Sequence, residues 1–108
     1  MIFFKANDTL YPASISGKVA DKEWDGRASK AVTLEMDYAE AAELFVDGLA
    51  WSIVEQMETE DGVQENEYDN AEYSIAGDLT DHRDGTVTAK MGRLTDLEEA
   101  YEIMLGGM

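Results

Sequence analysis

The chain has 108 residues, and its 24 acidic residues against 8 Lys and Arg give a net charge of −16 at pH 7. This charge argues against direct binding to a nucleic-acid backbone, because acidic side chains and phosphates repel each other. The absence of cysteine excludes a disulfide scaffold, a thiolate zinc site and a cysteine nucleophile. With 44% hydrophobic residues and no apolar run near the ~20 residues of a membrane helix, residues 1–108 are expected to form one folded domain without a membrane span.

The N-terminal third of the chain reads as paired strands. Residues 2–13 predict two short strands around Asn7-Asp8, because both residues tolerate a positive φ and suit a tight hairpin. Residues 31–36 predict a strand whose alternate residues are apolar. Asp25-Gly26 marks a turn, so residues 14–24 are expected to be the preceding strand, partly loop because of Gly17.

Residues 37–48 predict the first helix. Asp37 and Glu40 have the spacing of a capping box, and Gly48 is expected to cap the C-terminus. Tyr38 and Phe45 bound an apolar stripe at helical spacing that also holds Ala41 and Ala42.

Two further hairpins follow. Residues 50–57 predict a strand, and Asp61-Gly62 indicates a turn inside a strongly acidic segment that we expect to be mobile. Residues 73–79 and 86–91 predict the next pair of strands.

A second helix is expected to begin at Thr95, with Glu98 completing a capping box. An apolar stripe follows at helical spacing, and Gly106-Gly107 is expected to end the helix. The stripe consists of Leu97, Ala100, Tyr101 and Met104.

Together these elements predict an α+β fold. Hairpins imply antiparallel pairing, so we expect a small antiparallel sheet of about five to six strands with two helices packed on one face. Trp51, Tyr38 and Tyr101 are expected in the core because they lie on the apolar faces of their elements.

The segment 76–92 holds Asp78, Asp81, His82 and Asp84 just before a glycine, which raises the question of a metal site. A calcium loop of the EF-hand type needs oxygen ligands at alternate positions and an acid at position twelve, where this chain has Ala89. We therefore favour a hairpin turn at residues 84–85, although weak cation binding by the loop 78–85 stays open.

No pattern in the sequence supplies an active site. His82 is the only histidine, so a multi-histidine metal centre is excluded, and its place near a turn predicts exposure. With 24 acids, no particular carboxylate pair can be chosen for acid–base chemistry. Phosphate-binding glycine motifs are absent as well. We expect no enzyme activity, no cofactor and no metal.

Two features are candidates for binding a partner. Trp24 lies beside a turn in a charged segment, so it is either an exposed anchor or a side chain folded back over the edge of the core, and we favour the second. Glu98, Glu99 and Glu102 predict an acidic ridge on the last helix, which is either a solvated face or a surface for a basic partner.

The sequences WDGRASKA, at residues 24–31, and DHRDGT, at residues 81–86, lie in two of three longer segments. Together the three segments cover most of the chain. The segments are TLYPASISGKVADKEWDGRASKAVTLEMDYAEA, AWSIVEQ and EYSIAGDLTDHRDGTVTAKMGRLTDLEEA. They resemble a group of small acidic proteins encoded in prophages and tailed phages of Gram-positive gut bacteria. The resemblance implies a phage or prophage origin near virion genes, and it carries no catalytic residues.

The first hypothesis for function is a non-enzymatic structural or assembly accessory protein, acting through a protein partner or self-association in the bacterial cytoplasm or on the virion. Short strands with open edges offer a route to such contacts. The alternative is an inhibitor whose acidic surface imitates nucleic acid and occupies a basic site on a host defence or regulatory protein. A small hydrolase or calcium-binding module is the third hypothesis.

Overall fold

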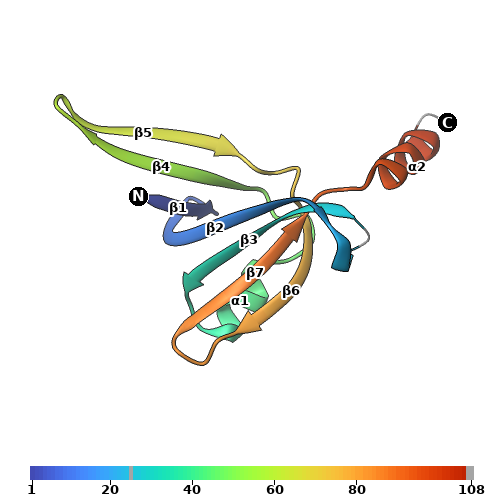
Figure 1. Ribbon diagram of the computed structural model, residues 1–108, viewed down its shortest axis with the longest axis horizontal. Coiled ribbons are helices and arrows are strands. Elements are labelled where there is room, and N and C mark those ends of the chain that lie inside the picture. The colour runs from blue at the N-terminus through green and yellow to red at the C-terminus, as the bar shows by residue number, and fades with distance from the viewer. Residues whose placement is uncertain (25, 107–108) are drawn as a thin grey trace.

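The computed structural model describes residues 1–24 and 26–106, and in the last helix the side chains of Asp96, Glu102 and Leu105 lie outside the described part. Seven strands form one antiparallel sheet in the order β5-β4-β1-β2-β3-β7-β6. The α+β class with an antiparallel sheet is confirmed, with seven strands instead of five to six (Figure 1). In chain order the elements are β1 (Ile2–Ala6), β2 (Thr9–Asp21), the 3₁₀ turn η1 (Lys22–Trp24), β3 (Arg27–Glu35), α1 (Tyr38–Leu44), β4 (Trp51–Thr59), β5 (Gly62–Asp69), β6 (Ile75–Asp81), β7 (Thr86–Gly92) and α2 (Asp96–Gly106).

The long strand β2 joins the two halves of the sheet. Its first residues, 9–12, pair with β1, whereas residues 13–21 pair with β3. The expected hairpin at Asn7-Asp8 is confirmed, since these residues have φ values of 52° and 63° and β1 pairs with β2 on either side. The strand continues through Gly17, which we expected to weaken it, because Gly17 pairs with Lys30 of β3.

The hydrophobic core lies between the two halves of the sheet and α1. Phe4 of β1 is fully buried, and its ring centroid lies 5.0 Å from that of Phe45 and 5.3 Å from that of Trp51. The other half of the sheet contributes Val32 and Met91, both also fully buried. Trp51 is therefore a core residue, as predicted.

α1 is shorter than expected. It ends at Leu44 with Phe45 as its C-cap, so Gly48 lies beyond the helix in a turn of positive φ and does not cap it. Asp37 is the N-cap, yet its side chain makes no capping hydrogen bond. The prediction that Tyr38 is a core residue is wrong, because this side chain is 46% exposed at the first turn of so short a helix.

The acidic segment 58–70 forms the end of β4, the turn predicted at Asp61-Gly62 and the strand β5. β5 pairs with β4 along its whole length, from Thr59 opposite Gly62 to Ser52 opposite Asp69. Backbone hydrogen bonds to β4 therefore stabilise a strand whose side chains give almost no apolar alternation. The β4–β5 hairpin extends well beyond the rest of the sheet (Figure 1).

α2 does not pack on the sheet, so the prediction of two helices on one face is incorrect for this helix. It leaves the end of β7 and extends away from the body of the protein, on the side opposite the tip of the β4–β5 hairpin (Figure 1). Tyr101, expected in the core, is 63% exposed. None of the described helices combines the length and apolar character needed to cross a bilayer.

Candidate functional site

The most unusual surface of the molecule is the apolar side of α2. Three apolar residues of the predicted stripe are largely exposed, with exposed fractions of 81% for Leu97, 63% for Tyr101 and 70% for Met104. We call these three residues the α2 stripe. Leu94, just before the helix, joins Leu97, Glu98 and Tyr101 in lining an open hollow of about 460 Å³. Exposed apolar side chains that adjoin one another are typical of protein–protein contact sites.

Glu98 determines how α2 begins. The predicted capping box is confirmed: the backbone N–H of Thr95 donates to Glu98 Oε1 at 2.9 Å, and the N–H of Glu98 donates to Thr95 Oγ1 at 3.3 Å. The same carboxylate also receives both terminal nitrogens of Arg27, at 2.7 Å from Nη1 to Oε1 and 3.2 Å from Nη2 to Oε2. The bidentate Arg27 guanidinium, with the N–H of Thr95, lowers the pKa of Glu98 to about 2.

Arg27 connects the helix to the sheet. It is 94% buried at the start of β3, where its Nη1 also donates to the carbonyl oxygen of Arg93 at 2.9 Å. Its Nε has no hydrogen-bond partner among the described atoms. The buried guanidinium thus binds Glu98 and also the backbone at Arg93, between β7 and α2. These contacts hold α2 in one direction relative to β3 and β7.

Trp24 covers the outer face of the sheet beside this anchor. A Cβ atom added to Gly77 or Gly92 would lie 2.7 or 2.8 Å from the indole ring, so the ring rests on two strands that carry no side chain there. The Arg27 guanidinium carbon lies 5.0 Å and Lys90 Nζ 5.9 Å from the ring centroid. Trp24 is half-buried, as in the favoured interpretation of a side chain folded back onto the protein.

A buried ion pair lies next to Trp24. Asp21 is 1% exposed, and its Oδ2 receives Lys90 Nζ at 2.7 Å and the Ser29 hydroxyl at 3.4 Å. The hydrogen bond from Lys90 lowers the pKa of Asp21, and the same bond raises the pKa of Lys90. The pair links the end of β2 to β7 and so supports the platform on which Trp24 rests.

The predicted acidic ridge is divided by these contacts. Glu98 turns toward Arg27, while Glu99 lies 3.9 Å from Arg93 at its nearest carboxylate oxygen. The side chain of Glu102 lies outside the described residues. Glu98 is therefore a residue that orients the helix, and the sequence pattern alone gave no sign of its long-range partner Arg27.

The loop that raised the metal question is a hairpin turn, as predicted. β6 and β7 pair up to Asp81 opposite Val87. The acids bond the backbone locally: Asp81 accepts from the N–H of Arg83 and Asp84 from that of Thr86, each at 2.9 Å. Positive φ occurs at Arg83 and Gly85, so the turn is not the type I′ turn that Asp-Gly suggested.

His82 is exposed, as predicted, and bonds the Thr88 hydroxyl at 2.7 Å. Across the described parts of the chain, no three side chains of His, Asp or Glu gather in a way that could hold a metal ion.

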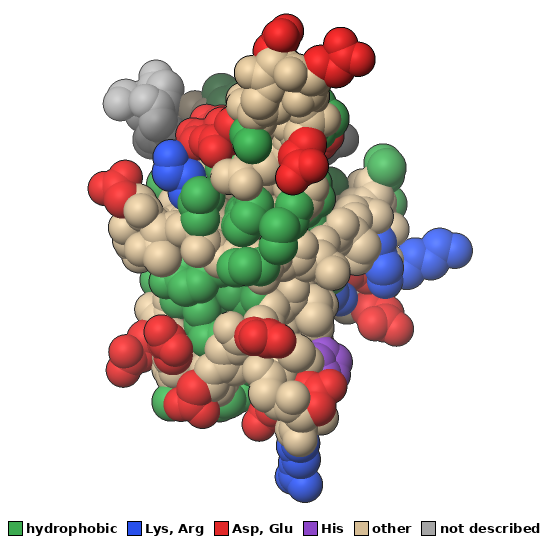
Figure 2. Space-filling view, turned by 90° about the vertical axis from the view of Figure 1, so that its left-hand side faces the viewer, with side chains coloured by type: hydrophobic (Ala, Val, Ile, Leu, Met, Phe, Trp, Pro, Cys, Tyr) green, Lys and Arg blue, Asp and Glu red, His purple; other side chains and the backbone are tan. Residues whose placement is uncertain are grey.

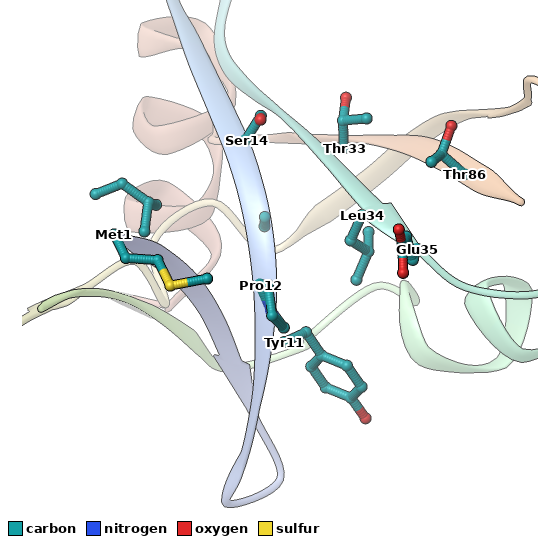
Figure 3. Close-up of a pocket in the computed structure, with 10 residues that line it drawn as sticks. Met1, Tyr11, Pro12, Ser14, Thr33, Leu34, Glu35 and Thr86 are labelled. Atoms are coloured by element: carbon teal, nitrogen blue, oxygen red, sulfur yellow. The ribbon is translucent and has the colours of Figure 1, made fainter.

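A second hollow lies where β2 changes partners. It is open, about 500 Å³ in volume, and lined by residues of β1, β2, β3 and β7. Figure 3 shows the hydroxyls of Ser14, Thr33 and Thr86 pointing to one side, while Tyr11 and Leu34 point to the other. These groups do not converge on one point, so the hollow has no arrangement of acid, base and nucleophile.

Comparison with known proteins adds no relative. No family model, curated protein or solved structure matches this chain.

Proposed function

We propose that this protein is a non-enzymatic structural or assembly accessory protein that works through protein–protein contacts. The α2 stripe is the observation that supports this most strongly. An apolar stripe at helical spacing is ordinarily buried against the helix's own domain. Here the helix extends into solvent with Leu97, Tyr101 and Met104 exposed, and a bidentate ion pair to Arg27 sets its direction. We propose that the stripe packs against a protein partner.

The distribution of charge supports the same proposal. Figure 2 shows hydrophobic side chains gathered in the middle of one face, with acidic side chains spaced around its margins. A surface of this kind favours contact with another protein more than imitation of a continuous phosphate backbone. The sheet also ends in two open edges, β5 and β6, whose unpaired backbone groups can add a strand.

The WDGRASKA and DHRDGT segments resemble phage and prophage proteins. This resemblance supports a bacterial cell that carries a phage as the place where the protein acts. We propose that the protein acts in the cytoplasm of an infected or lysogenic bacterium, with association with the virion as a further possibility to test.

Site-specific cross-linking tests the proposal. A photo-reactive amino acid at position 101, on the α2 stripe, is compared in the producing bacterium with the same group at position 19, which is 94% exposed on β2. We expect discrete protein adducts, to the chain itself or to a second protein, at position 101 and not at position 19. Equal and diffuse labelling at both positions would refute the proposal.

One observation favours the alternative of a nucleic-acid mimic. Glu65, Glu67 and Asp69 alternate along β5 and so project from one face of the hairpin. Lys5 already neutralises Glu67, at 2.9 Å from Nζ to Oε1. A basic partner that DNA displaces, and that is released as salt rises, would support this alternative.

A further inference from the structure

β5 is an open edge of the sheet, and its backbone groups face outward at every second residue. In an antiparallel pair, residues alternate between those that bond the neighbouring strand and those whose N–H and C=O point away from it. The N–H of Asn70 donates to the carbonyl oxygen of Trp51 at 2.8 Å, so the backbone of Trp51 faces β5. The backbone of Gln56 faces β1 instead, because its N–H donates to the carbonyl oxygen of Met1 at 2.9 Å.

This alternation fixes the backbone direction of every residue in β5. The odd-numbered residues of β4 face β5, and they lie opposite Gln64, Asn66 and Tyr68, which therefore bond β4. The residues between these three direct their N–H and C=O groups outward from the edge, where no further strand of the described chain pairs with them. The outward-facing residues, all exposed, are Val63, Glu65, Glu67 and Asp69.

The carboxylates of β5 belong to the same outward-facing residues. Because alternate residues share a face of the strand, Glu65, Glu67 and Asp69 project together beside the unpaired backbone groups. Glu67 is paired with Lys5, at 2.9 Å from Nζ to Oε1. Glu65 receives only the neutral amide of Gln56, at 3.0 Å, and Asp69 receives a backbone N–H at 2.9 Å. Two carboxylates of the edge therefore lack a cation among the described residues.

The other edge of the sheet is less suited to adding a strand. β6 has a register shift between Ala76 and Leu79, and Trp24 lies against Gly77 in the same stretch. Bulges of this kind hinder pairing with a further strand. β5 pairs in unbroken register from Gly62 to Asp69, contains no proline and lies in a hairpin that extends beyond the rest of the sheet (Figure 1). Its carboxylates are what protects this edge from unwanted pairing.

The charge of the edge selects its occupant. A second copy brings the same net charge of −16, so the copies repel each other. A strand with Lys or Arg at alternate positions instead places cations across from Glu65 and Asp69. Opposite charges on paired residues of neighbouring strands stabilise a sheet, whereas like charges destabilise it.

We propose that β5 binds an extended basic segment of another protein, which adds to the edge of the sheet as a further strand. The segment carries Lys or Arg at every second position, across from Glu65, Glu67 and Asp69, with neutral residues between them. Backbone hydrogen bonds provide the affinity and the alternating charges provide the specificity. The inference rests on the proposed function, contact with another protein, and names the chemistry of a partner at a surface separate from the α2 stripe.

A synthetic peptide tests the inference on the purified chain. The probe is a capped peptide as long as β5, in which Lys alternates with Thr and Val, titrated to millimolar concentration into the isotopically labelled chain. In NMR spectra we expect the largest amide shifts at the outward-facing residues of β5, because their N–H groups gain hydrogen bonds. The shifts should be small at Gln64, Asn66 and Tyr68, whose N–H groups already bond β4. Binding should weaken as salt rises.

Two matched controls separate strand addition from attraction by charge alone. The same peptide with its lysines N-methylated on the backbone keeps every charge but loses the N–H donors, so it should not produce the alternating shifts. Glu65→Gln should weaken binding of the probe by about two- to fivefold, which corresponds to one cross-strand charge pair. Glu43→Gln removes the same charge from an exposed position on α1 and should leave binding unchanged. Both substituted residues are exposed, and circular dichroism shows whether each variant is folded.

Three results would overturn the inference: no shift in β5 at millimolar probe, equal shifts along β5 whatever the direction of the N–H, or a methylated peptide that binds as tightly as its parent. The cross-linking at position 101 is a separate measurement. If position 101 gives specific adducts while the probe does not bind β5, the proposed function stands and the basic strand is excluded. If the probe binds as expected while position 101 gives none, the α2 stripe fails as the contact site and β5 remains.

Discussion

Replacing Gly92 by alanine tests the platform that positions α2. A Cβ at this position would lie 2.5 Å from Arg27 Cδ and 2.8 Å from Trp24 Cζ3. Carbon atoms pack best about 3.5–4.0 Å apart, so the indole and the arginine stem must move by roughly 1 Å. The indole cannot simply slide away, because Gly77 on β6 is also in close contact with it.

Two opposing effects decide how much Gly92→Ala changes the free energy of unfolding. Overpacking of this kind costs about 1–3 kcal/mol. Replacing a strand glycine otherwise gains about 0.5–1 kcal/mol, because alanine loses less conformational entropy on folding. The difference lies between about 0 and 2.5 kcal/mol, so we expect Gly92→Ala to reduce the free energy of unfolding by roughly 1 kcal/mol.

Gly17→Ala is the matched control. Gly17 also lies in a strand, but the nearest atom to an added Cβ is 3.8 Å away, so this variant should be equal to or slightly more stable than the wild type. Urea unfolding followed by tryptophan fluorescence measures both, and the indole N–H resonance of Trp24 reports its displacement. Equal stabilities with an unmoved Trp24 resonance would refute the argument that the ring rests on Gly92.

Three further outcomes follow from the structure. Lys90→Met removes the cation bound to the buried Asp21, so it should lower the free energy of unfolding, as measured by urea unfolding at pH 7. Lys22→Met, at the exposed 3₁₀ turn, is the control and should have a smaller effect. Because the pKa of Asp21 is lowered in the folded chain, the deficit caused by Lys90→Met should be complete above the ordinary carboxyl pKa of about 4 and should shrink as the pH falls further, toward the lowered pKa at which the folded carboxyl becomes protonated. The Glu98 carboxyl should titrate near pH 2 by NMR, so its contribution to stability is present above pH 4.5 and disappears as pH falls toward 2; titration near 4.5 would contradict the pairing. Calcium should leave the melting temperature unchanged, since the acids of the loop 78–85 bond its own backbone, and a large increase at micromolar calcium would show that a cation site exists.

The hairpins and the capping box are local features, and the sequence by itself determined them. Asn7 and Asp8 adopt positive φ and Thr95 and Glu98 cap α2, because each set of groups acts across only a few residues of chain. The alternation of Val32, Leu34 and Met36 likewise identified a strand with one buried face.

Only the tertiary structure decided the rest, because it depends on partners that are distant in the chain. β5 has no apolar pattern and forms through hydrogen bonds to β4. The apolar spacing of an amphipathic helix is the same whether its stripe packs on its own sheet or is exposed to solvent. The sequence therefore could not show that α2 extends away from the domain. Arg27, which contacts Glu98 across 71 residues, holds α2 in that direction, and the glycines of β6 and β7 make room for Trp24 beside Arg27.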